Sequence, residues 1–113
     1  MNLKLKCGGF KNNIVEMTNY NSRFGGGVQY IFRFDNKYGA SVIKRLGSFG
    51  AKYNRWELAV LIFTEDGAHY ITYNTPITDD VLEDLTDGEV IGILGKIRDL
   101  KIGAGLEGEE NEQ

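Results

Sequence analysis

The most apolar stretch of the chain covers residues 56–63 and carries a single charge, on Glu57. Turn-forming residues follow it directly at positions 65–67. An apolar run of this length, bounded by turn residues, is typical of a strand that is covered on both faces. It is short for a buried helix. We therefore predict that residues 56–63 form the central strand of a sheet.

Alternation of apolar and polar positions predicts further strands on both sides of this run. Residues 28–34 alternate, then residues 40–46 alternate again after a turn, and residues 68–73 return after the turn that follows the central strand. Successive side chains of a strand point to opposite faces, so each run has one apolar face. The pattern predicts a four-stranded antiparallel meander over residues 28–73. We expect its core face to carry Val28, Tyr30, Phe32 and Phe34.

The N-terminal third gives weaker signals. Residues 3–6 alternate apolar and basic side chains as an edge strand does, and residues 14–17 form a candidate short strand. The polar, glycine-rich residues 18–27 separate this region from the meander. Glycine has the most backbone freedom to lose on ordering, so we predict a mobile loop there.

The spacing of apolar residues changes after Pro76, and this proline has no N–H to donate to a strand ladder. Thr78, Asp79 and Asp80 predict the start of a short helix, and its inward residues would be Val81, Leu82 and Leu85.

A second helix is predicted from the capping-box spacing of Thr86 and Glu89. Gly92 and Gly95 weaken this helix, and close packing of the helix on the sheet would explain them. Its apolar residues recur at helical spacing. They are Val90, Ile93, Leu94, Ile97 and Leu100.

These elements predict an α+β fold, an antiparallel β-sheet of about 4–6 strands packed against a C-terminal helical segment. Its length of 113 residues favours one domain. We place that single α+β domain at residues 1–102. Residues 103–113 show no periodicity and are rich in Glu, so we predict a disordered acidic tail.

Charge is distributed unevenly along the chain. Residues 1–55 hold ten basic and two acidic residues, whereas residues 56–113 hold three basic and fourteen acidic ones. The net charges of +8 and −11 add to the overall −3. Such halves indicate either a basic ligand-facing surface with an acidic appendage or two regions that neutralise each other within one fold.

No residue pattern predicts an enzyme, a cofactor site or a metal site. His69 and Cys7 are single residues of their types, and nothing in the sequence brings them together as a nucleophilic pair. We expect His69 to be a polar strand residue and Cys7 a small buried side chain. The single cysteine excludes an internal disulfide. No apolar run reaches the ~18 residues that span a bilayer, and no signal-peptide core is present, so we predict a cytoplasmic protein without membrane contact.

The basic half alternates cations with aromatic residues. Cations and stacking rings on a sheet bind single-stranded nucleic acid, although core aromatics beside solvated cations give the same pattern. Exposed rings in the glycine-rich loop and in residues 48–55 are alternatively anchors for a protein partner. The candidate partner-binding residues are Arg23, Phe24, Phe49, Lys52, Tyr53, Arg55 and Trp56.

Several segments resemble a group of small, uncharacterised bacteriophage proteins with a "YGASVV … SYG … WELAVL … TPIT-DV" pattern. The matching segments begin at Tyr38, Ser48, Trp56 and Tyr73 and extend to the final helix, about residues 34–100. Asn74 stands where the group usually has Asp before Thr-Pro. The resemblance implies a phage origin and a compact core, and it implies no catalytic residues.

Two functions follow as hypotheses. The first is a non-enzymatic phage accessory protein that binds and modulates or inhibits a host protein in the host cytoplasm, for example an anti-CRISPR-like inhibitor of a host-defence factor. The second is a nucleic-acid-binding module that uses the basic aromatic half. A homodimer is compatible with either.

Overall fold

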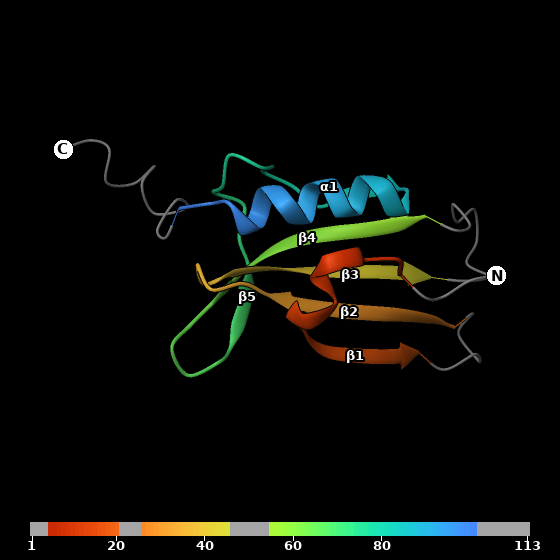
Figure 1. The fold of residues 1–113 in the computed structure, drawn as a ribbon, viewed down its shortest axis with the longest axis horizontal. Coiled ribbons are helices and arrows are strands. Elements are labelled where there is room, and N and C mark those ends of the chain that lie inside the picture. The colour runs from red at the N-terminus through yellow and green to blue at the C-terminus, as the bar shows by residue number, and fades with distance from the viewer. Residues whose placement is uncertain (1–4, 21–25, 46–54, 102–113) are drawn as a thin grey trace.

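The computed structural model describes residues 5–20, 26–45 and 55–101. A 3-10 helix and a strand open the described chain, and strands with one closing α-helix follow (Figure 1). In chain order the elements are η1 (Gly8–Asn13), β1 (Ile14–Tyr20), β2 (Gly27–Arg33), β3 (Tyr38–Arg45), β4 (Trp56–Phe63), β5 (His69–Ile71), β6 (Leu82–Leu85) and α1 (Asp87–Arg98).

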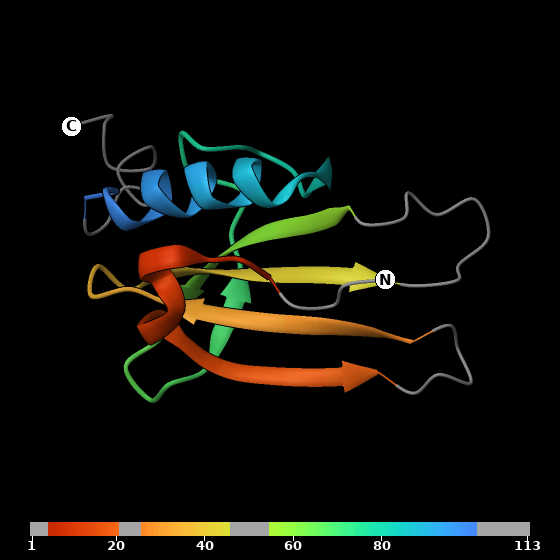
Figure 2. The same ribbon diagram turned by 45° about the vertical axis from the view of Figure 1, so that its right-hand side comes forward.

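The strands form one antiparallel six-stranded sheet in the order β1-β2-β3-β4-β5. β6 pairs with β4 on the same side as β5, with β6 at the start of β4 and β5 at its end. Figures 1 and 2 show α1 beside β4, with β1 at the far margin of the sheet. The predicted α+β architecture, with the sheet against a C-terminal helix, is confirmed.

β4 has the predicted bounds and is buried on both faces. Trp56, Leu58 and Val60 belong to the main core beneath α1. Ile31, Leu61 and Phe63 form a second buried cluster on the opposite face, which we call the outer cluster. Both views show β5 running steeply across the direction of β3. The meander β2-β3-β4-β5 is confirmed, with β5 shorter than expected.

The N-terminal predictions are only partly correct. Leu5 and Lys6 lie outside any strand, and the rest of the predicted strand at 3–6 lies outside the described residues. Leu5 is buried, and its backbone N–H donates to the hydroxyl of Tyr30 at 3.4 Å. The short strand predicted at 14–17 is β1, which continues through the start of the predicted loop to Tyr20. Hydrogen bonding to β2 extends this strand into polar sequence that alternation alone does not mark.

The short helix predicted after Pro76 is wrong, because this segment adds β6 to the edge of β4. Leu82 lies opposite Leu58, and Leu85 lies opposite Trp56. Asp84 has φ of 62°, which a right-handed helix excludes. Its left-handed backbone and the accompanying register shift bring both leucines toward the core, although they are three residues apart.

α1 begins and packs as predicted. The Thr86 hydroxyl accepts from the Glu89 backbone N–H at 3.2 Å, and the Glu89 carboxylate accepts from the Thr86 N–H at 2.8 Å. The predicted close contact does not explain Gly92, where an added methyl group would meet nothing within 4 Å. A methyl group at Gly95 would contact Phe10 of η1, not the sheet. The buried face of α1 is formed by Val90, Leu94 and Ile97.

The end of α1 is fastened to the turn between β2 and β3. The buried Asn36 amide donates to the carbonyls of Ile97 at 2.8 Å, Arg98 at 3.1 Å and Leu100 at 2.8 Å. Its side-chain oxygen accepts from the backbone N–H of Tyr38 at 3.0 Å.

No helix in the described ranges is long and apolar enough to cross a membrane. The predicted acidic tail lies outside the described residues.

Candidate functional site: the free sheet edge and its adjoining hollow

β1 is a free edge of the sheet. It pairs with β2 on one side, and within residues 5–20, 26–45 and 55–101 no strand pairs with its other side. The outward N–H and C=O groups of such an edge are available to a further strand. β1 lies at the margin farthest from α1 (Figure 2), so α1 does not cover its open side.

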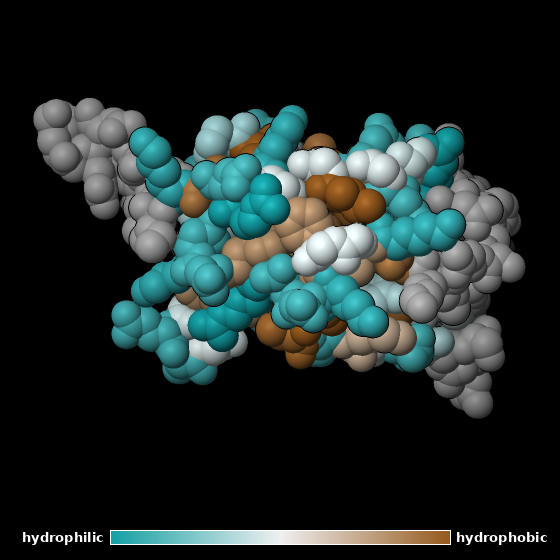
Figure 3. Space-filling model, in the orientation of Figure 1, coloured by the Kyte–Doolittle hydropathy of each residue, from teal (hydrophilic) through white to brown (hydrophobic). Residues whose placement is uncertain are grey.

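β1 also exposes large apolar side chains. Val15 is 57% exposed, Met17 is 53% exposed and Tyr20 is 40% exposed. Met17 lies opposite Tyr30 and Tyr20 lies opposite Gly27, so Met17 and Tyr20 project to opposite faces. Figure 3 shows apolar atoms over β1 on the face turned to the viewer. Apolar side chains exposed on a free edge strand favour pairing with a further strand.

Few of the features that protect sheet edges occur in β1. Glu16 is its only charged residue, and the strand contains neither lysine nor proline. A register shift between Ile14 and Glu16 distorts only its start. At the opposite margin, the short strands β5 and β6 cover the outer side of β4. β1 is therefore the described strand best suited to receive another chain.

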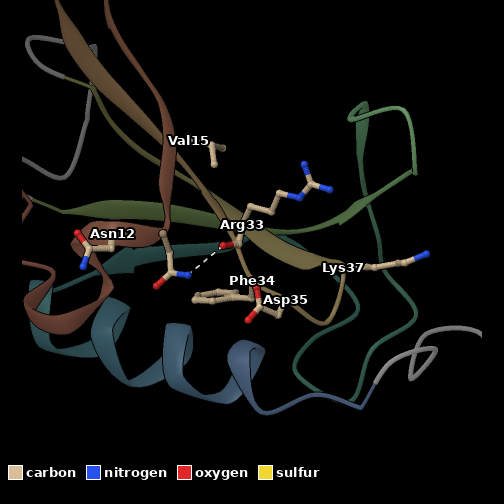
Figure 4. Close-up of a pocket in the computed structure, with 7 residues that line it drawn as sticks. Asn12, Val15, Arg33, Phe34, Asp35 and Lys37 are labelled. Carbon is tan, nitrogen blue, oxygen red and sulfur yellow. Dashed lines mark hydrogen bonds between the residues drawn. The ribbon is translucent and has the colours of Figure 1, made fainter.

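A hollow of about 460 Å³ opens where β1 begins. It lies between η1, the start of β1 and the turn that follows β2 (Figure 4). The side-chain amide of Asn13 donates to the carbonyl of Arg33 at 3.1 Å, which ties η1 to the end of β2. The lining residues are Asn12, Asn13, Val15, Arg33, Phe34, Asp35 and Lys37. We call this space the β1 hollow.

Arg33 lines the β1 hollow, and its guanidinium lies at the side of the hollow, over the outer cluster. Its guanidinium carbon lies 5.0 Å from the centroid of the Phe63 ring, within cation–π range. The ring of His69 lies 5.2 Å from the same ring. None of the ion pairs among the described residues includes Arg33. The ring contact favours one orientation of the guanidinium, and Arg33 is exposed to solvent.

The other charges of the β1 hollow are mixed. Lys37 forms an exposed ion pair with Glu65 at 3.5 Å, and such surface pairs contribute at most about 1 kcal/mol. Figure 4 shows Lys37 directed away from Asn12. Asp35 adds a carboxylate, and it also lines an adjoining hollow of about 390 Å³ beside Arg98. The charge balance suits one anionic group better than a polyanion.

The structure places few of the predicted partner-binding residues at a common surface. Arg55 is exposed and pairs with Asp84 at 3.7 Å. Trp56, its neighbour, is fully buried, and its indole N–H donates to Asp87 at 2.6 Å. This placement gives no support to a partner contact by Trp56, because the apolar β4 pattern draws the ring into the core. The other candidates, Arg23, Phe24, Phe49, Lys52 and Tyr53, lie outside the described residues.

The alternation of cations and rings in the basic half does not form a described stacking surface. Tyr30 and Phe32 are core residues, as their alternation predicts. Lys44 is buried with Nζ 4.4 Å from the Trp56 ring, and burial lowers the pKa of its ammonium, against an opposing effect of Asp87. Arg45 forms two hydrogen bonds to Glu57, at 3.1 and 3.0 Å.

The remaining reactive side chains have structural surroundings. Cys7 is buried and His69 is exposed, as predicted. A hydrogen bond from the Thr64 hydroxyl lowers the pKa of Asp66 within the β4–β5 turn. In the part of the chain that the structure describes, no three His, Cys, Asp or Glu side chains form a group that would hold a metal ion.

The free edge was only partly visible in the sequence. Residues 14–17 predict a short strand, but the pattern does not tell which strand ends the sheet. The signal that could have marked the site is the apolar Val15 and Met17 within a segment of low charge. Comparisons with protein-family models, curated proteins and solved structures find no match.

Proposed function

We propose that this protein is a non-enzymatic binding protein that engages a partner protein by adding one of the partner's extended segments to β1. The unpaired edge with exposed Val15 and Met17 is the observation that carries this proposal. In strand addition, backbone hydrogen bonds supply much of the affinity and alternate side chains supply specificity. The resemblance to small phage proteins makes a bacterial host protein, including a host-defence factor, the first class of partner to test.

A nucleic-acid-binding module is the alternative and has less support. Three described cations of the basic half are held in ion pairs, as in Lys37–Glu65, Arg45–Glu57 and Arg55–Asp84. Lys44 is buried. Nucleic-acid binding needs cations that reach phosphates and rings that reach bases. Two rings of the predicted stacking pattern, Tyr30 and Phe32, belong to the core instead.

The test is capture of a host protein on the immobilised full chain, followed by affinity measurement with the purified partner. Met17→Lys places a charge on the exposed edge and should weaken binding at least tenfold, because edge lysines oppose strand addition. Tyr70→Lys is the matched control, because Tyr70 is 62% exposed on β5. It should retain wild-type affinity.

Hydrogen exchange gives the second measurement. Amides of β1 should become protected when the partner binds, since a new strand would pair with them. Equal affinity of wild type and Met17→Lys would contradict the proposal. So would binding of a single-stranded oligonucleotide whose affinity falls steeply with salt, which favours the alternative. A concentration-dependent homodimer abolished by Met17→Lys would make a second copy the occupant of β1.

A further inference from the structure

We infer that the β1 hollow receives an acidic side chain of the protein segment that adds to β1. This inference rests on the proposed function and specifies the chemistry of the partner. Val15 and Arg33 border the same space, so one bound segment can contact both. Val15 belongs to the free edge, and Arg33 supplies the cation beside it.

Arg33 is prepared to bind a carboxylate. Its guanidinium lies over Phe63 at 5.0 Å, a contact that favours one orientation of the side chain and so lowers the freedom lost on binding. No carboxylate of the described ranges forms an ion pair with it. A guanidinium presents N–H donors in a planar fork that matches the two oxygens of a carboxylate.

The surroundings favour a carboxylate over a phosphate chain. Asp35 lines the same hollow, and Glu65 already pairs with Lys37. A polyanion would bring several negative charges against these two carboxylates. A single acidic side chain satisfies Arg33, and its apolar neighbours in the segment lie on Val15. Asn12 and Asn13 provide neutral amides at the rim of the hollow.

The experiment selects ligands from a displayed library of random ten-residue peptides on the full-length protein. The best peptide is then synthesised with its acidic residue and with the matching Gln or Asn. Wild type should bind the acidic peptide at least tenfold more tightly. Arg33→Gln should reduce this ratio to near one, and Arg33→Glu should reverse it in favour of a peptide with Lys at that position. Comparing the affinities of the two peptides for the same variant separates the contact between Arg33 and the carboxylate from other effects of the substitution.

Arg45→Gln is the matched control. Arg45 is an exposed cation that pairs with Glu57 at a distance from the β1 hollow, and its removal should leave the peptide ratio unchanged. Far-ultraviolet circular dichroism establishes that each variant is folded. A ratio unchanged by Arg33→Gln, or selected peptides without an acidic residue, would overturn the inference.

The Met17→Lys variant separates this inference from the proposed function. If it abolishes binding while Arg33→Gln leaves the ratio unchanged, strand addition stands and the carboxylate subsite is rejected. If Met17→Lys has no effect on the peptides, the edge is not the binding surface and both are rejected. Failure to select any peptide rejects both as well. Oligonucleotide binding lost in Arg33→Gln would assign the hollow to nucleic acid and overturn the inference.

Discussion

Lys44 is buried, and its ammonium lies 4.4 Å from the centroid of the Trp56 ring of the main core. The same indole donates its N–H to Asp87 at 2.6 Å, at the first turn of α1. The Trp56 side chain therefore contacts both the ammonium of Lys44 in β3 and the carboxylate of Asp87 in α1. Burial of the ammonium opposes this arrangement, because a charge loses hydration that its partners only partly replace.

Lys44→Met should leave the protein as stable as wild type or more stable, by about 0–2 kcal/mol. Methionine fills a similar volume and packs well against an aromatic ring. Arg45→Met is the control, because that neighbouring side chain is exposed and its surface ion pair contributes at most about 1 kcal/mol. Urea unfolding at neutral pH provides the measurement. A large loss of stability in Lys44→Met would show that the buried cation is a net stabilising group.

The pH dependence tests the same cation independently. Burial lowers the pKa of Lys44 below its ordinary 10.5 in the folded protein. Between the folded and the unfolded pKa the unfolded chain binds more protons, so raising the pH favours folding. The free energy of unfolding of wild type should rise relative to that of Lys44→Met as pH increases toward 10.5. A difference that stays constant or falls with pH would contradict the lowered pKa.

Asn36→Ala should destabilise the protein by about 2–3 kcal/mol, because it leaves carbonyls at the end of α1 without their donor. The wild-type amide donates to Ile97, Arg98 and Leu100. Asn12→Ala makes the same chemical change at an exposed position and should cost less than about 0.5 kcal/mol. Thermal unfolding of the two variants provides the comparison. Equal melting temperatures would show that the turn does not fasten the helix.

Local patterns predicted the elements whose signals are local. The structure confirms three predictions that depend only on residues close together in the sequence. They are the apolar strand β4, the alternating strand β2 and the capping box of Thr86 and Glu89. β6 was missed because leucines three residues apart fit a short helix equally well. The choice was decided by the open edge of β4 and the left-handed backbone of Asp84.

The candidate site could not be predicted as fully, because it depends on which strand lies last in the sheet. Trp56 and Met17 illustrate the difference. Aromatic content near basic residues marked Trp56 as a partner contact, yet the register of β4 buries it. Met17 is an apolar residue of the kind expected in a core, but it is exposed because β2 is the only described strand that pairs with β1. Exposure here follows from topology, which local hydrophobicity does not encode.

Glu89 should make the stability of the protein depend on pH in the acid range. The Thr86 backbone N–H donates to its carboxylate, which lowers the pKa of Glu89 below its ordinary 4.5. A depressed pKa contributes stability that is complete above the unfolded value and is lost as pH falls through the folded value. Wild type should therefore exceed Glu89→Gln in stability at neutral pH, and the difference should shrink below pH 4.5.

Urea unfolding across this range measures the difference. Glu83→Gln removes an exposed glutamate of β6 that is not part of the helix cap. It should show a smaller change between neutral and acid pH. A Glu89→Gln difference that grows on acidification would contradict the capping contribution.

Gly92 and Gly39 differ in the space available for an added methyl group. Gly92→Ala should stabilise the protein by about 0.5–1 kcal/mol, because alanine has the higher helix propensity. Its added methyl group would meet nothing within 4 Å. Gly39→Ala is the same change in β3, where the methyl group would collide with the carbonyl oxygen of Phe32. This clash should cost several times more than Gly92→Ala gains, since the backbone of paired strands must move apart. Urea unfolding of both variants measures whether each change raises or lowers the free energy of unfolding. Stabilisation by Gly39→Ala would show that β2 and β3 are less closely packed than their geometry indicates.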